Sequence, residues 1–112
     1  MEKTLNILWT TGDPRTAQSM VLMYAKNSML RQWWDHVNVI IWGASAKLVA
    51  EDETIQTEIE LSKHAGVTFT SCIACAVQQG VVDKFNTLGI EMKPWGEPLT
   101  ELIQSGQHLI TV

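Results

Sequence analysis

Five segments of strand length recur along this chain of 112 residues, and stretches long enough for helices separate them. Most residues in the five segments are apolar, and the segments cover positions 5–9, 37–42, 67–70, 90–93 and 108–112. Strands joined by helical crossovers run parallel, because a short turn would return the chain antiparallel. Helices then cover both faces of the sheet. This order predicts an α/β fold of three layers, α/β/α, in a single domain over residues 1–112.

The intervals between these segments carry helical signals. One amphipathic helix is expected from position 14 to about position 33, where small and apolar residues share a face. Asp13 and Pro14 suit its N-cap and its first helical position. The residues expected on its inner face are Ala17, Met20, Val21, Tyr24, Ala25 and Ser28. Further helices are expected over positions 46–49, 54–65, 73–79, 82–88 and 99–105.

Composition excludes several classes of partner. A net charge of −4 at pH 7 argues against nucleic acid, because nucleic-acid-binding domains present a basic surface. No run approaches the roughly 20 apolar residues that a membrane-spanning helix needs. Residues 1–3 lead into the first strand without a signal peptide. We therefore expect a cytoplasmic protein with no membrane partner.

The two cysteines of the chain, Cys72 and Cys75, fall where the third strand turns into a helix. A thiol at a helix N-terminus lies near unpaired backbone N–H groups and the positive end of the helix dipole, which both favour the thiolate. Cytoplasmic thiols stay mostly reduced, so a structural disulfide is not expected. The spacing fits a dithiol/disulfide couple, a persulfide carrier with a resolving thiol, half of a zinc site, or simple packing.

Zinc needs four ligands in a structural site. The further candidates are His36, His64 and His108, and none of them forms a His-x-x-x-His pair. We therefore expect neither a metal nor another cofactor. Buried packing stays open, because a free cysteine behaves as a small apolar residue.

Several segments resemble the DsrE-like family of small sulfur-relay proteins, and the TusD-type branch in particular. The most specific match combines Gly66-Val67, the cysteine at position 72 and the segment Gly80-Val81-Val82-Asp83. The resemblance extends to Ile7–Thr10, Trp42-Gly43 and Trp95–Leu99, and so covers nearly the whole chain. It implies a five-stranded parallel sheet and assembly into trimers or hexamers.

In that family, the cysteine that matches Cys72 accepts sulfane sulfur as a persulfide and passes it to a partner protein. The resemblance therefore implies a sulfur carrier, or sulfurtransferase, with donor and acceptor proteins as partners. Position 75 departs from the TusD-type pattern, where alanine is more usual. A thiol there could attack a Cys72 persulfide and release sulfide.

Ligands of parallel sheets gather beyond the carboxyl ends of the strands. We therefore expect ligand contacts near the cysteines from Thr11, Gly12, Asp13, Gly43 and Trp95, with helix capping as the favoured role of Asp13.

Two other hypotheses stay open. The chain could be a non-catalytic oligomeric binding module in which the cysteines are buried and structural. Trp33, Trp34 and Trp95 would then lie at subunit contacts, where aromatic residues concentrate. It could also be a dithiol/disulfide redox protein that uses Cys72 and Cys75. Whether the chain is an enzyme is left open by its sequence.

Overall fold

One sheet of five parallel strands organises the computed structural model, which describes residues 2–112. The strands are β1 (Thr4–Trp9), β2 (His36–Ile41), β3 (Thr68–Cys72), β4 (Glu91–Lys93) and β5 (His108–Thr111). Their order across the sheet is β4-β3-β2-β1-β5. The chain thus extends the sheet in one direction through β4 and then crosses to the opposite edge. The predicted five-stranded parallel sheet is confirmed.

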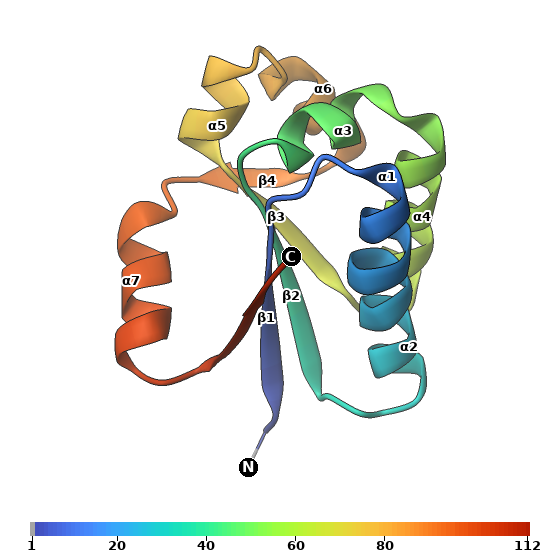
Figure 1. Ribbon diagram of the computed structural model, residues 1–112, viewed down its shortest axis with the longest axis vertical. Helices are drawn as coiled ribbons and strands as arrows, with labels where there is room; N and C mark the ends of the chain where they lie inside the picture. The colour runs from blue at the N-terminus through green and yellow to red at the C-terminus, as the bar shows by residue number, and fades with distance from the viewer. Residues whose placement is uncertain (1) are drawn as a thin grey trace.

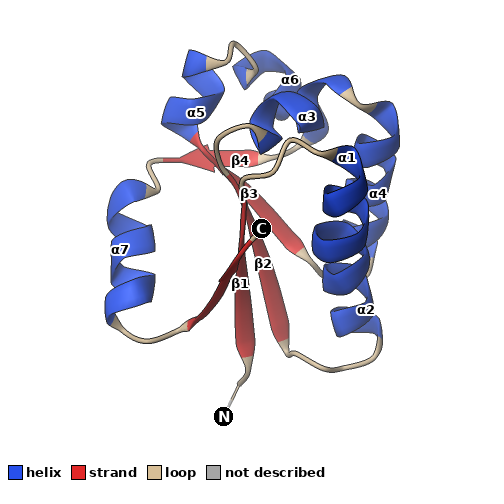
Figure 2. Ribbon diagram, in the orientation of Figure 1, coloured by secondary structure: helices blue, strands red, loops and turns tan. Residues whose placement is uncertain are grey.

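Helices cover the two faces of the sheet unequally (Figures 1 and 2). A continuous helical segment and α4 (Glu53–His64) lie on one side, and α7 (Gly96–Gln104) lies on the other. The continuous segment consists of α1 (Pro14–Thr16), η1 (Ala17–Met23) and α2 (Tyr24–Leu30). Three short helices follow strands β2 and β3: α3 (Ser45–Glu51), α5 (Ile73–Gln78) and α6 (Val82–Leu88). Within residues 2–112, no helix has the length and apolar character to cross a bilayer.

The first long helix contains a π-helical stretch that the sequence pattern did not indicate. In η1 the wider turn brings Leu22 to the core, where it is 1% exposed, while Met20 is turned outward and 45% exposed. A π-helix bonds residue i to residue i+5, so Leu22 falls beneath Ala17. The expectation that Met20 faces inward is therefore wrong. Ala17, Val21, Ala25 and Ser28 are buried as expected.

The main core fills the space between the sheet and the η1–α4 side. It includes Ile7 and Trp9 of β1, Val39 and Ile41 of β2, and Phe85 of α6, all of them inaccessible to solvent. The other face of the sheet carries a smaller apolar cluster near the carboxyl ends of the strands. Because α7 has no fully buried residue, that face is less completely covered. The candidate site lies there.

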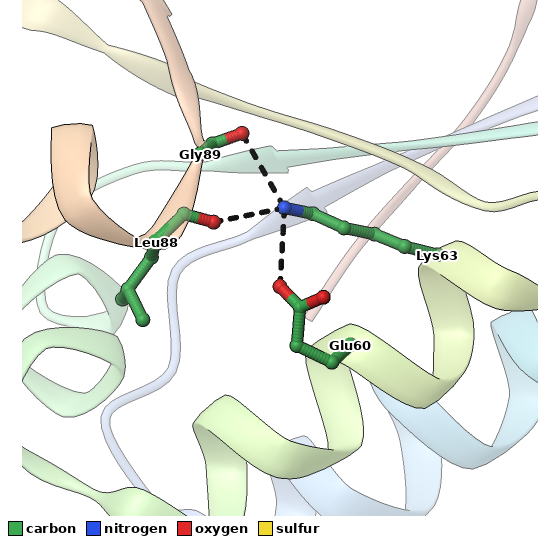
Figure 3. Close-up of polar contacts among 4 residues, drawn as sticks. All are labelled: Glu60, Lys63, Leu88 and Gly89. Carbon is green, nitrogen blue, oxygen red and sulfur yellow. Dashed lines mark hydrogen bonds and ion pairs between the residues drawn. The ribbon is translucent and has the colours of Figure 1, made fainter.

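Lys63, near the end of α4, joins this helix to the turn between α6 and β4 (Figure 3). Its Nζ donates to the carbonyl oxygens of Leu88 at 3.0 Å and Gly89 at 3.3 Å. Glu60 Oε1 lies 3.4 Å from the same nitrogen. A cation thus satisfies carbonyl groups at the end of α6, where the helix dipole is negative.

We predict that Lys63→Met lowers the free energy of unfolding by about 1 kcal/mol, because charge-assisted hydrogen bonds to two carbonyls are lost from a half-buried position. Urea denaturation would measure the change. Lys47→Met is the matched control, since Lys47 is an exposed lysine within helix α3. Equal stabilities of the two variants would contradict the prediction.

Candidate functional site

Cys72 ends β3 and begins the turn into α5. The strand extends two residues beyond its expected end, because Thr70, Ser71 and Cys72 pair with Glu91, Met92 and Lys93 of β4. Cys72 keeps extended backbone angles, with φ −67° and ψ 121°, and is the N-cap residue of α5. The thiol is therefore placed at the carboxyl edge of the sheet by strand pairing and not by the helix alone.

The two thiols share an apolar cluster on the α7 side of the sheet. Cys72 is 4% exposed and Cys75 is 9% exposed, and both are free thiols. Ile40 and Trp95 are buried with them. Leu8, Trp42, Leu99 and Leu102 pack around this group. Cys72 and Cys75 thus lie within one enclosed cluster, with Trp95 as its largest member.

Trp95 closes the cluster from the loop before α7. Its indole Nε1 donates to Thr70 Oγ1 at 3.1 Å, which fixes the ring, and it is 7% exposed. This position corrects the hypothesis that Trp95 lies at a subunit contact, because the side chain is buried within its own chain. Trp34 donates to the Tyr24 hydroxyl, whereas Trp33 stays half exposed.

Cys75 is connected to the loop that follows β2. The Gly43 N–H donates to Cys75 Sγ at 3.4 Å, and Gln79 Nε2 donates to the Gly43 carbonyl at 2.8 Å. Gly43 has φ +68°, a left-handed conformation that favours glycine. Burial raises the pKa of the Cys75 thiol, and the neighbouring Cys72 adds to this, while the Gly43 hydrogen bond opposes it. Cys75 is therefore not the easily ionised thiol that its place in the turn suggested.

Cys72 faces the apolar cluster, and its side chain forms no capping hydrogen bond with the first turn of α5. The thiol lies in the apolar cluster with Ile40 and Trp95. Strand geometry explains this, because alternate residues of β3 point to opposite faces, and Cys72 shares the face of Thr70.

The loop after β1 contributes less directly than expected. Asp13 accepts from the Thr16 N–H at 2.9 Å and from the Thr16 hydroxyl at 2.7 Å, which confirms it as the N-cap of α1. These two bonds, the side-chain bond first, lower the pKa of Asp13. The Thr11 N–H donates to the Val112 carbonyl at 3.1 Å. A Cβ added at Gly12 would lie 3.3 Å from Ala44 Cβ, so this loop packs against the loop of Gly43.

Of the five residues expected to contact a ligand, the structure thus brings Gly43 and Trp95 to the cysteines. The other three, Thr11, Gly12 and Asp13, lie in the adjacent loop. There the Thr11 N–H donates to the Val112 carbonyl, and the Asp13 carboxylate accepts from the Thr16 N–H. No three His, Cys, Asp or Glu side chains among residues 2–112 converge in a way that could hold a metal ion.

A groove of about 470 Å³ adjoins the cysteine cluster, between α7 and the sheet. Asn6 and Asn38 line it from the sheet, and Lys93, Trp95, Glu101 and Leu102 are among the residues that border it. Trp95 and Leu102 therefore belong to both features, the groove and the packing around Cys72. Asn6 and Asn38 are not among the site residues expected from the sequence.

A polar ladder connects four strands beneath this groove. Thr68 Oγ1 donates to Asn38 Oδ1, Asn38 Nδ2 donates to Asn6 Oδ1 at 3.3 Å, and Asn6 Nδ2 donates to the His108 carbonyl at 3.2 Å. Asn6 and Asn38 are paired in the register of β1 and β2. A signal for them existed in the sequence, since each interrupts an otherwise apolar strand at an equivalent position.

Comparison with solved structures places the chain among proteins of the same architecture. It is 43% identical to the conserved protein of unknown function BT1422 from Bacteroides thetaiotaomicron, with a TM-score of 0.95, covering 98% of this chain and 95% of that one. The chain belongs to the family of BT1422. No protein-family model matches the sequence, and a search of curated proteins finds no match.

Two more distant structures share the fold of the BT1422 family. The protein of unknown function MTH1491 from Methanobacterium thermoautotrophicum is 12% identical, with a TM-score of 0.77. The ychN protein from E. coli is 15% identical, with a TM-score of 0.71. Each alignment covers 100% of both chains. At these identities the similarity shows the fold alone.

We predict that Leu102→Ala accelerates modification of the thiols by a maleimide or an aromatic disulfide several-fold under native conditions. The substitution removes a side chain that packs on the cysteine cluster and borders the groove. Ile103→Ala, on the exposed side of the same helix, should leave the rate unchanged. Equal rates in both variants would show that α7 does not control access. Repeating the measurement with Cys75→Ser assigns the rate to Cys72.

Proposed function

We propose that this chain is a DsrE-like sulfur-handling protein in which Cys72 accepts sulfane sulfur as a persulfide and passes it to a partner protein. The observation that carries the proposal is the position of Cys72, which ends a central parallel strand, opens α5 and shares an enclosed cluster with a second thiol. The sequence resemblance around Gly66–Asp83 supports the same function. Trimers or hexamers in the cytoplasm, with donor and acceptor proteins, are part of this proposal.

Acceptance of sulfur is a thiol–persulfide exchange. The Cys72 thiolate attacks the outer sulfur of a donor persulfide, R–S–SH. A new S–S bond forms on Cys72, the S–S bond of the donor breaks, and the donor leaves as the thiolate R–S⁻. The proton stays on the transferred sulfur, so the product is Cys72–S–SH. Transfer to an acceptor thiolate repeats the same exchange with Cys72 as the leaving group.

The apolar surroundings suit a stored persulfide. Sulfur is polarizable and makes favourable contacts with aromatic side chains, such as that of Trp95. Exclusion of bulk water and oxidants limits the oxidation of an exposed sulfur atom. Since Cys72 is only 4% exposed, exchange with a donor requires Trp95 or α7 to move aside. In this proposal, access to the thiol is therefore controlled by the packing of α7 on the sheet.

The second thiol, that of Cys75, affects the lifetime of a persulfide on Cys72. If the Cys75 thiolate attacks the Cys72 sulfur that bears the persulfide, a Cys72–Cys75 disulfide forms and HS⁻ leaves. Because burial raises the pKa of Cys75, the attacking thiolate is scarce at neutral pH. This limits the loss of sulfur that an adjacent cysteine would otherwise cause.

A second function, that of a non-catalytic oligomeric binding module, is favoured by the burial of both thiols. In that case the cysteines pack the cluster beneath α7 and take no part in chemistry. Trp33, which is 50% exposed, would lie at a contact with another subunit. The native reactivity of Cys72 separates the two functions.

We predict that incubation with a low-molecular-weight persulfide donor adds one sulfur atom to the peptide that contains Cys72, as read by mass spectrometry. Cys75→Ser should retain this product, and Cys72→Ser should lose it, because the acceptor sulfur is missing. The sulfur-relay proposal fails if Cys72→Ser gains sulfur as efficiently as the wild type. Lack of any uptake by the folded wild-type protein would favour the binding module.

We also predict that release of sulfide from the loaded protein depends on pH through Cys75. Its pKa is raised, so the thiolate fraction is small at pH 7 and increases about tenfold per pH unit until the pKa is reached. The rate of sulfide release should follow this increase between pH 7 and pH 9. Cys75→Ser should abolish the dependence. A pH-independent rate, or an unchanged rate in Cys75→Ser, would exclude Cys75 as the attacking group.

A further inference from the structure

Two side chains of opposite charge border the groove beneath α7 without pairing with each other. Lys93 approaches from the end of β4, and Glu101 approaches from α7. The ion pairs within residues 2–112 are formed by other side chains, and none of them includes Lys93 or Glu101. The groove thus presents one cation and one anion to whatever occupies it.

The position of Lys93 is defined by an aromatic contact. Its Nζ lies 4.4 Å from the centroid of the Trp95 ring. This cation–π contact holds the ammonium group against a ring that is itself fixed by the hydrogen bond to Thr70. Lys93 is therefore held at the border of the groove by its neighbours and keeps its charge available for a ligand.

The floor of the groove adds hydrogen-bond donors. Each side-chain amide carries two N–H groups. In the polar ladder, Asn38 uses one of them toward Asn6, and Asn6 uses one toward the His108 carbonyl. The ladder fixes the orientation of both amides. Asn6 is only 2% exposed, whereas Asn38 is half-buried, so Asn38 is the amide that can offer its second N–H group to a ligand. An amide donor and a lysine suit a carboxylate, which is an acceptor only.

We propose that this groove binds a small zwitterion, an amino acid or a short peptide with a free ammonium and a free carboxylate. Lys93 and the Asn38 amide hold the carboxylate, and Glu101 holds the ammonium group. Trp95 and Leu102 supply the apolar surface for the side chain of the ligand. A volume of about 470 Å³ lies within the range of roughly 300–1,000 Å³ that is typical of small-molecule sites.

This binding site would also identify a class of sulfur donor. Trp95 and Leu102 line the groove and also pack in the cluster of Cys72, and Lys93 is the β4 partner of Cys72 in the sheet. A zwitterion that carries a thiol or persulfide would therefore be held next to the acceptor cysteine. This second step rests on the proposed sulfur-relay function, whereas the binding of an unreactive zwitterion does not.

The test uses three probes that differ only in charge. S-methyl-L-cysteine carries both groups, 3-(methylthio)propanoic acid lacks the ammonium, and 2-(methylthio)ethylamine lacks the carboxylate. All three are thioethers, so they cannot take part in persulfide exchange. Titration into the ¹⁵N-labelled protein should give saturable shifts for the zwitterion at the Trp95 indole N–H and at the side-chain amides of Asn6 and Asn38. The two singly charged probes should bind at least about tenfold more weakly, a loss of about 1.4 kcal/mol or more.

Substitutions of Lys93 and Glu101 then test whether these two residues bind the charged groups of the ligand. Lys93→Gln and Glu101→Gln should each weaken binding of S-methyl-L-cysteine about tenfold, equivalent to about 1.4 kcal/mol. Lys84→Gln and Glu97→Gln are matched controls, because both residues are exposed and neither borders the groove. The controls should bind as the wild type does. All four positions are at the surface or partly exposed, so the variants are expected to fold, which circular dichroism verifies.

Three outcomes would overturn the proposal. They are the absence of saturable shifts with the zwitterion, shifts centred away from the groove, and binding of a singly charged probe as tight as that of the zwitterion. Loss of sulfur uptake by Cys72 has no bearing on these results, because the probes do not react. Conversely, zwitterion binding in Cys72→Ser that equals the wild type would support the site even if the relay function fails.

Discussion

Parallel pairing between β3 and β4 sets Cys72 opposite Lys93, and the arrangement of the candidate site follows from this register. A strand that ended at Thr70 would leave the cysteine in a loop. Because pairing continues to Cys72, the chain leaves β4 at Lys93 and returns directly over the thiol, where Trp95 packs. The hydrogen bond from Trp95 to Thr70 then joins the returning chain to the same strand.

The two faces of the sheet differ in how they are packed. The η1–α4 side contains the main core, with Trp9, Ile41 and Phe85 fully buried. The α7 side combines a small apolar cluster with the ladder of Thr68, Asn38 and Asn6. Buried amides are costly unless their hydrogen bonds are satisfied. The ladder satisfies them across adjacent strands, so the fold can keep polar groups beneath a groove without losing its core.

Burial has opposite consequences for the two cysteines in the proposed chemistry. For Cys75 it raises the pKa and reduces attack on a neighbouring persulfide. For Cys72 it restricts access, so that a donor reaches the thiol only after the packing of α7 and Trp95 changes. A carrier needs both protection and access, and helices with few buried residues open more readily than those with many. Since α7 has no fully buried residue and covers the thiols, the proposal assigns the opening to this helix.

Local patterns were enough to predict the architecture. Strand-length apolar segments, the Asp13 cap and the helix intervals depend on residues close in sequence, and the structure confirms the five-stranded parallel sheet. The edge location of Cys72 and Cys75 followed from the same local order. The inward face of the first helix was predicted only in part, because its π-helical turn buries Leu22 in place of Met20, and a π-helical turn departs from the 3.6-residue period.

The tertiary structure alone decided how the site is enclosed. Cys72, Trp95 and Leu102 are far apart in the chain, and their contact depends on the register of β4 and on where α7 lies. The pKa of Cys75 follows from this burial and not from its position in the turn. Asn6 and Asn38 come together beneath the groove only when β1 and β2 pair. Sequence by itself determines the order of elements, because hydrogen bonding and periodicity are local, whereas burial and charge placement depend on segments that meet only in the folded chain.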